Sequence, residues 1–126
     1  MKADFVYTGI RVRDLERSVA FYTKILNMQV TGRQKIKEAD GEVVSLQSRK
    51  DGPELELNFY EKGSTHDAPY TVGEGLDHLA FRVGNMDEAI REAEAAGHPV
   101  VLDVRTAKSR WVYIQDPDGL YSELFS

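Results

Sequence analysis

Four side chains that can bind metal recur at matching places in the two halves of this sequence. The stretch Tyr7-Thr8-Gly9-Ile10-Arg11-Val12 superposes on His78-Leu79-Ala80-Phe81-Arg82-Val83, which aligns Tyr7 with His78 and Arg11 with Arg82. Glu56 and Glu123 come near the end of each half. An imidazole, two carboxylates and a phenol suit a divalent cation and leave positions open for water or substrate. The set Tyr7, Glu56, His78 and Glu123 therefore predicts a catalytic metal site.

Each of these residues also has an ordinary explanation. Polar side chains on the uncovered face of an antiparallel sheet are common, and a single histidine or glutamate there is usually solvated. Arg11 and Arg82 could solvate the sheet, pair with the glutamates or bind an anionic substrate. Trp111 and Tyr121 could belong to a dimer interface. The recurrence in both halves is what favours the metal site.

The first half is predicted to place these residues with a β-α-β-β-β unit. Alternation predicts a strand over Phe5 to Arg13, with Val6, Thr8, Ile10 and Val12 on one face. A helix capped by Asp14 follows from Leu15 to about Leu26, with Leu15, Val19, Tyr22 and Leu26 as its apolar stripe. Strands are expected over Met28 to Glu38, Glu42 to Ser48 and Glu54 to Tyr60, the first two joined at Asp40-Gly41.

The second half repeats this order after a polar loop from Glu61 to Glu74 that contains His66. The strand around His78 leads to a helix from Met86 to Ala96, which begins with the capping pattern Asn85/Glu88 and ends at Gly97. Strands are predicted over Val100 to Arg105, Arg110 to Gln115 and Leu120 to Phe125. Asp116-Pro117-Asp118-Gly119 is a tight turn in which glycine takes the positive φ.

The fold class predicted from this order is α+β. We expect one domain of two βαβββ modules, about 4–60 and 76–126, forming a cup-shaped, antiparallel-rich mixed sheet with helices on the outer face. The face that the helices leave uncovered would collect Tyr7, Arg11, Glu56, Asn58, His78, Arg82, Trp111, Tyr113, Tyr121 and Glu123.

Composition narrows the classes of partner. A chain of 126 residues suits one compact domain. The formal net charge of -5 and a pI near 5.2 argue against nucleic acid or an acidic membrane surface. The absence of cysteine excludes disulfides, thiolate ligands and cysteine nucleophiles. No apolar run is long enough to span a bilayer and no signal-peptide core is visible, so a cytoplasmic protein with a small-molecule substrate is expected.

Motifs spread over nearly the whole chain resemble those of the vicinal oxygen chelate superfamily, which includes glyoxalase I, bleomycin-resistance proteins and extradiol dioxygenases. The matching stretches are Ile10 to Tyr22, Leu55-Glu56-Leu57, Asp77 to Val83, Asp116 to Gly119 and Glu123-Leu124. The resemblance implies paired βαβββ modules around one divalent metal (Zn, Ni, Co or Mn) and a homodimer whose sites often form between chains. Within the superfamily the pattern most resembles glyoxalase I (lactoylglutathione lyase).

The resemblance also implies residue roles. Glu56, His78 and Glu123 match three ligand positions of glyoxalase I, and Tyr7 stands where the family usually has His or Gln. Arg11 matches an arginine that holds the carboxylate of glutathione, which could be replaced here by another thiol because Tyr60 stands where the family has an asparagine, and Asn58 lies two positions earlier. The metal would stabilise an enediolate formed from the hemithioacetal of methylglyoxal.

In that mechanism the two glutamates move the proton. Glu123 would take it and Glu56 would return it, or the reverse. Arg11 with Lys108 or Arg110 would hold the substrate's carboxylates, while Trp111 and Tyr113 would exclude water. Two alternatives stay open: a related enolate-forming epimerase of acyl thioesters, and a metal-free protein that sequesters a ligand as bleomycin-resistance members do.

Overall fold

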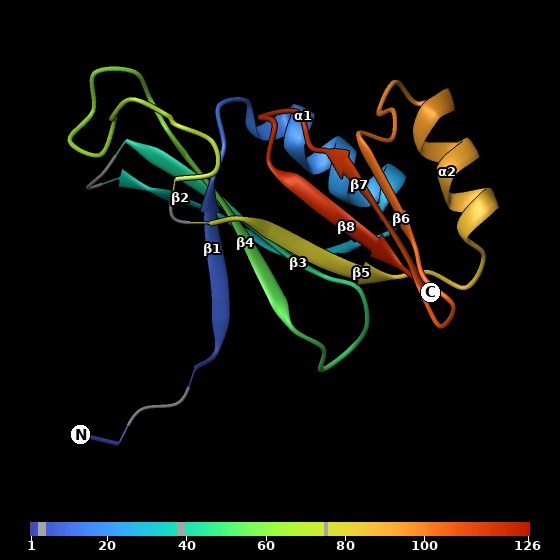
Figure 1. Ribbon diagram of the computed structural model, residues 1–126. Helices are drawn as coiled ribbons and strands as arrows, with labels where there is room; N and C mark the ends of the chain where they lie inside the picture. Colours follow the sequence, from blue (N-terminus) through green and yellow to red (C-terminus); the bar gives the residue numbers. More distant parts are fainter. Residues whose placement is uncertain (3–4, 38–39, 75) are drawn as a thin grey trace. The chain divides into compact units, whose positions relative to one another are not determined.

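The computed structural model spans Met1–Ser126 and describes residues 1–2, 5–37, 40–74 and 76–126 (Figure 1). Its elements, in chain order, are β1 (Tyr7–Arg11), α1 (Leu15–Ala20), a π-helical turn η1 (Phe21–Ile25), β2 (Gln29–Ile36), β3 (Gly41–Gln47), β4 (Glu54–Tyr60), β5 (His78–Arg82), α2 (Met86–Ala95), β6 (Leu102–Arg105), β7 (Arg110–Gln115) and β8 (Tyr121–Phe125). The predicted end of the second strand at Glu38, the first module's start at position 4, and Gly75 lie outside the described residues.

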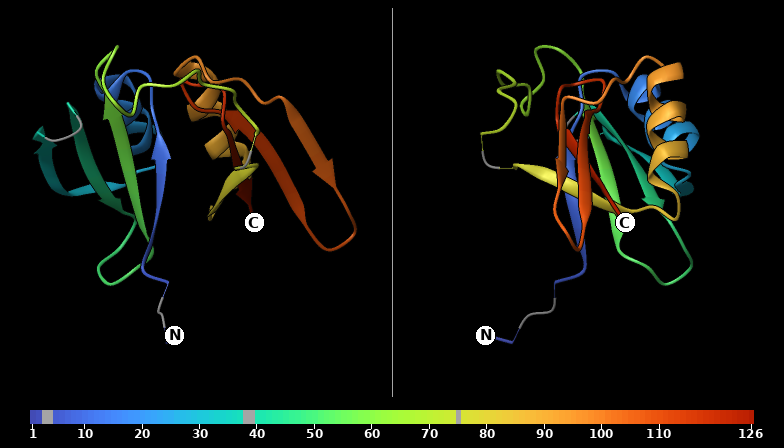
Figure 2. Two further views of the ribbon diagram at one scale, coloured as in Figure 1. Left: turned by 90° about the vertical axis from the view of Figure 1, so that its left-hand side faces the viewer. Right: turned by 45° about the vertical axis from the view of Figure 1, so that its right-hand side comes forward.

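The chain divides into two compact units, Met1–Pro69 and Tyr70–Ser126, each with one four-stranded sheet (Figure 2). The strand order is β1-β4-β3-β2 in the first unit and β5-β8-β7-β6 in the second. In both, the first strand runs parallel to the last and the remaining pairs are antiparallel. The predicted βαβββ order and the α+β class are confirmed.

Strand alternation assigns the buried face of each sheet as predicted. In the first unit the buried side includes Ile10, Val44, Leu46, Leu55 and Leu57, and in the second Val112, Ile114, Ser122 and Leu124. The first strand is shorter than predicted because pairing with β4 begins at Tyr7. Phe5 and Val6, which precede this pairing, are 87% and 72% exposed.

The first helix departs from the predicted regular stripe. It changes from α-helix to a π-helical turn at Phe21, and its buried residues are Leu15, Ser18, Phe21 and Tyr22. Val19 and Leu26 are only half-buried. A wider turn brings two consecutive aromatic side chains to the core face, where the rings of Phe21 and Tyr22 meet edge to face. The 3.6-residue period could not reveal this change.

The helix ends and the last turn follow the sequence signals. Asp14 accepts a hydrogen bond from the Arg17 amide, and Asn85 accepts one from Glu88, both at 3.1 Å. Gly97 and Gly119 both have positive φ, as predicted for a helix end and for the turn before β8. Within the described residues, no helix is long and apolar enough to cross a membrane.

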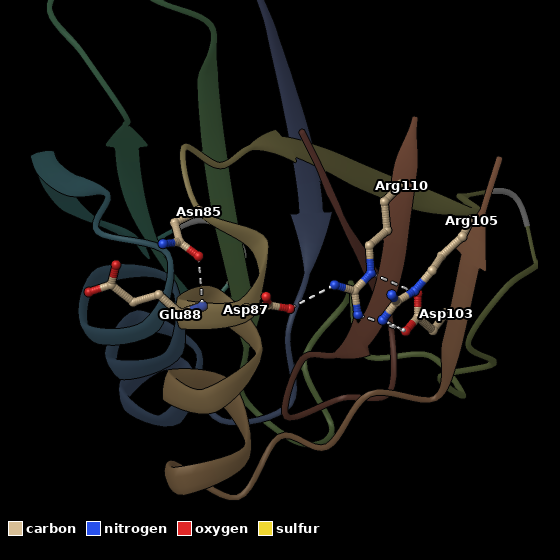
Figure 3. A network of polar contacts seen from close by, with 6 residues as sticks. All are labelled: Asn85, Asp87, Glu88, Asp103, Arg105 and Arg110. Carbon is tan, nitrogen blue, oxygen red and sulfur yellow. Dashed lines mark hydrogen bonds and ion pairs between the residues drawn. The ribbon is translucent and has the colours of Figure 1, made fainter. Parts of the chain in front are cut away.

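An arginine ties each helix to its sheet. Arg33 of β2 pairs with Glu16 of α1 and with Glu42 of β3. In the second unit, Arg110 of β7 pairs with Asp87 of α2 and Asp103 of β6, both at 2.8 Å (Figure 3). The helix carboxylates occupy equivalent places just after the N-cap. On the strands the positions are exchanged: the arginine is on the edge strand β2 in the first unit, whereas in the second unit the edge strand β6 carries the acidic residue.

Candidate metal and acid-base site

His78 and Glu123 lie together on neighbouring strands of the second unit. Glu123 is opposite Ala80 in the parallel pair of β5 and β8, so it shares a face with His78. Nε2 of His78 lies 3.3 Å from Oε2 of Glu123, and both side chains are partly shielded from solvent. An imidazole nitrogen and a carboxylate oxygen at this separation can share a proton or a metal ion.

Tyr113 supports this pair from the other side of β8. It lies directly opposite Glu123 in the antiparallel pair of β7 and β8. Burial together with the negative charge of the nearby Glu123 carboxylate raises the pKa of the Tyr113 phenol. The Tyr113 ring lies 5.4 Å from that of His78 and stacks on Tyr121 at 5.3 Å. Tyr113 therefore lies beside the pair, and the pocket wall predicted for it stays a prediction.

Asp77 contacts His78, and the sequence patterns did not predict this contact. Its Oδ2 lies 2.6 Å from Nδ1 of His78, on the side of the ring away from Glu123. The neutral tautomer that uses this contact carries its proton on Nδ1 and leaves the Nε2 lone pair facing Glu123. The signal was available, because Asp77 precedes His78 directly in the sequence.

The first unit presents Tyr7, Glu56 and Asn58 on one face of its sheet. Glu56 lies opposite Gly9 of β1 and Ser45 of β3. Asn58 covers Gly9 closely: a Cβ atom added there would lie 3.1 Å from Nδ2 of Asn58. Tyr7 is 45% exposed and Glu56 is half-buried, so both are open to a ligand.

The strand register makes the two units equivalent at these positions. Glu56 lies opposite Gly9, two residues after Tyr7, and Glu123 lies opposite Ala80, two residues after His78. Tyr7 and Glu56 in the first unit therefore hold the same relation as His78 and Glu123 in the second. The sequence repeat predicted this equivalence for the first strands and for the glutamates on the last strands, and the strand register agrees with it.

The predicted substrate-binding cations differ in their surroundings. Arg11 lies opposite Asn58 on the same face as Glu56 and contacts Asp67 and the carbonyl of Ala68. Lys108 lies in the turn between β6 and β7, where its amide donates to Thr106.

Arg110 lies on the opposite face of its sheet from Glu123. It shares that face with the buried Val112 and Ile114 and pairs with Asp87 and Asp103 (Figure 3). In this structure Arg110 therefore joins α2 and β6 to β7 on the face away from Glu123.

The spacing of the candidate ligands fits a divalent ion for one pair of side chains. Two ligand atoms about 2.1 Å from one tetrahedral zinc lie about 3.4 Å apart. The 3.3 Å between Nε2 of His78 and Oε2 of Glu123 matches this spacing. Over residues 1–2, 5–37, 40–74 and 76–126 no group of three or more His, Asp or Glu side chains is arranged to hold a metal. Each unit supplies one pair.

The sequence also matches a known protein family with this fold. Residues 4–124 match the model of the Glyoxalase/Bleomycin resistance protein/Dioxygenase superfamily. The chain belongs to this superfamily, as its sequence motifs predicted.

Its relatives include lactoylglutathione lyases. The chain is 31% identical over 123 residues to the lactoylglutathione lyase of Salmonella typhimurium, covering 94% of this chain and 89% of that protein. It is 29% identical to a probable lactoylglutathione lyase of Vibrio parahaemolyticus, covering 94% and 87%. Among solved structures, the trypanothione-dependent glyoxalase I of Leishmania major is similar with a TM-score of 0.79 and 27% identity, over 99% of this chain and 87% of that one.

Proposed function

We propose that this protein is a metal-dependent lyase or isomerase of the glyoxalase I type. Its substrate would be the hemithioacetal that a thiol such as glutathione forms with methylglyoxal or a similar 2-oxoaldehyde. The observation that carries the proposal is the matched register of Tyr7/Glu56 and His78/Glu123. The similarity to lactoylglutathione lyases supports the same reaction.

The proposed metal ligands are Glu56, His78, Glu123 and Tyr7. A divalent ion bound by them would polarise the adjacent oxygens of the substrate and favour loss of the carbon-bound proton. His78 would hold its position through Asp77, whose carboxylate contacts Nδ1 and leaves Nε2 available. Tyr7 would contribute a phenol oxygen, or a water in its place would complete the set.

The proton transfer would be made by the glutamates. Glu123 would accept the carbon-bound proton, with its carboxylate oriented by the Tyr113 hydroxyl. Glu56 would return a proton to the neighbouring carbon, and the two roles could be exchanged. Arg11, Asn58 and Lys108 would bind the polar ends of the substrate, and Trp111 with Tyr113 would limit the access of water.

Metal content and turnover together test this proposal. Purified protein without a tag would be analysed by elemental mass spectrometry beside Glu123→Gln and His78→Ala. We expect one divalent ion per site in the wild type and its loss in both variants. Thioester formation from methylglyoxal would then be assayed with glutathione and with other thiols.

Three results would change the proposed function. A wild type that takes up none of Zn, Ni, Co and Mn would exclude the metalloenzyme. Tight ligand binding that survives chelation would instead indicate a sequestering protein. Metal binding without hemithioacetal turnover would favour the epimerase of acyl thioesters, which needs the same enolate chemistry.

We also propose a homodimer in the cytoplasm, with the metal pairs of the two units brought together within one chain or between chains. Light scattering of the purified protein would measure the mass of the assembly. Mixing His78→Ala with Glu56→Gln protein would then distinguish the two arrangements. Recovery of metal binding in the mixture would show that the site forms between chains.

A further inference from the structure

The side chain of Arg11 is engaged by the chain's own loop. Its Nη2 lies 3.4 Å from Oδ1 of Asp67 and also donates to the carbonyl of Ala68. A ligand that binds this nitrogen must therefore displace these partners. Both charged side chains keep about a third of their surface exposed, at 30% and 33%. The pair is therefore within reach of solvent and of a dissolved anion.

The loop presents Asp67 to Arg11 in a fixed orientation. The second carboxylate oxygen of Asp67 accepts a hydrogen bond from the Gly63 amide at 2.8 Å, and the Asp67 amide donates to the carbonyl of Ser64 at 3.1 Å. The neighbouring His66 ring lies 5.3 Å from the ring of Tyr60 at the end of β4. Residues 61–68 are thus held on the first unit by the Arg11 contacts and by the His66–Tyr60 ring contact, and the Glu61 amide also donates to the Asp40 carbonyl at 2.8 Å.

The contact between the Asp67 carboxylate and the Arg11 guanidinium is weak for an ion pair. A charge-assisted hydrogen bond between guanidinium and carboxylate is normally 2.7 to 2.9 Å long and often bidentate. At 3.4 Å through a single nitrogen, Asp67 makes less than the full interaction. A free carboxylate that approaches with both oxygens can form the better pair and replace it.

We propose that Asp67 is an internal competitor for the anion site of Arg11, and that residues 61–68 form a latch which a carboxylate-bearing ligand displaces. This inference rests on the proposed function only in taking Arg11 as the contact for the substrate's carboxylate. Ligand binding and release of the loop are then linked, because the ligand binds only the fraction of molecules in which Arg11 is free. The strength of the Asp67–Arg11 contact therefore lowers the apparent affinity of any carboxylate ligand for Arg11.

The matched variants are Asp67→Asn and Glu61→Gln. The asparagine keeps an oxygen that can accept from Gly63 but removes the charge that competes for Arg11. Glu61→Gln changes the net charge equally in the same loop. The probes are glutarate, which has only carboxylates, and glutathione, which adds the thiol; calorimetry at low salt measures their affinities. Because an exposed ion pair contributes roughly 0.2 to 1 kcal/mol, Asp67→Asn should bind the probes up to about fivefold more tightly.

Hydrogen exchange gives a readout that does not depend on catalysis. In the wild type, saturation with either probe should speed exchange of the Gly63 and Asp67 amides, whereas Arg11→Gln should show no such response. Release of the loop by glutarate but not by glutathione would support the latch and count against glutathione as the thiol. Equal tightening by Asp67→Asn and Glu61→Gln would overturn the latch. So would unchanged loop exchange at saturation, or failure of both probes to bind the wild type and Asp67→Asn.

Discussion

Tyr113 and Glu123 lie directly opposite each other on β7 and β8, which places the tyrosine hydroxyl on the same face of the sheet as the carboxylate, where it can donate a hydrogen bond to it. Removing this donor in Tyr113→Phe should leave the ring stack in place and free the carboxylate to turn. If Glu123 moves the proton, we expect kcat/KM to fall by on the order of tenfold, about the effect of one hydrogen bond. Tyr121→Phe is the matched control, since Tyr121 stacks on the same ring. Equal losses in both variants would contradict the role given to the Tyr113 hydroxyl.

Asp77→Asn tests how His78 is positioned. Replacing the carboxylate that contacts Nδ1 should weaken divalent metal binding by about 10- to 100-fold, as loss of such a partner usually does. Nitrogen-15 NMR of the metal-free protein should show the Nδ1–H tautomer of His78 in the wild type and a mixture of tautomers in the variant. Glu74→Gln, an exposed site with the same change of charge, should alter neither quantity. An unchanged tautomer in Asp77→Asn would exclude this role.

Asp103 makes the stability of the fold depend on pH in the acid range. Hydrogen bonds from Arg110 are the main reason that the pKa of this carboxyl lies below its ordinary value. A folded-state pKa that is lowered stabilises the fold above the unfolded value, near 3.9, and this contribution disappears as pH falls through the folded value. We expect Asp103→Asn to melt a few degrees below the wild type at pH 7, with the difference closing below pH 4.

The control for Asp103 is the exposed Glu92 on α2. Glu92→Gln removes one negative charge from the same unit without touching the Arg110 contacts shown in Figure 3. Thermal melts of the three proteins between pH 2.5 and 7 measure the effect. A gap between wild type and Asp103→Asn that stays constant over this range would show that the carboxylate does not contribute through its charge.

Ser122 carries a buried hydroxyl in the core of the second unit. The residue is 0% exposed, and its Oγ finds no hydrogen-bond partner among the described residues. Because an unsatisfied buried hydroxyl costs free energy, Ser122→Ala should raise the free energy of unfolding by about 1 kcal/mol. Thr23→Val removes a hydroxyl that donates to the Val19 carbonyl at 2.7 Å and should give no such gain. Urea denaturation compares the variants, and a destabilised Ser122→Ala would contradict the prediction.

The sequence by itself determined the order of elements and the face on which each candidate residue lies. Alternation placed Glu123 opposite the buried side of β8 and Glu56 opposite that of β4, because successive side chains of a strand point to opposite faces. Asp14, Asn85, Gly97 and Gly119 marked helix ends and a turn through local backbone chemistry, which needs no tertiary contact. These features depend on residues close together in the chain, so local rules find them.

Only the tertiary structure decided which side chains meet. The 3.3 Å contact of His78 with Glu123 and the position of Tyr113 opposite Glu123 depend on β8 lying between β5 and β7, a strand order that alternation does not encode. The contact between Arg11 and Asp67 likewise joins residues far apart in the sequence. Such contacts are set by register and by how a loop packs, and their energies depend on distances that residue types alone do not fix.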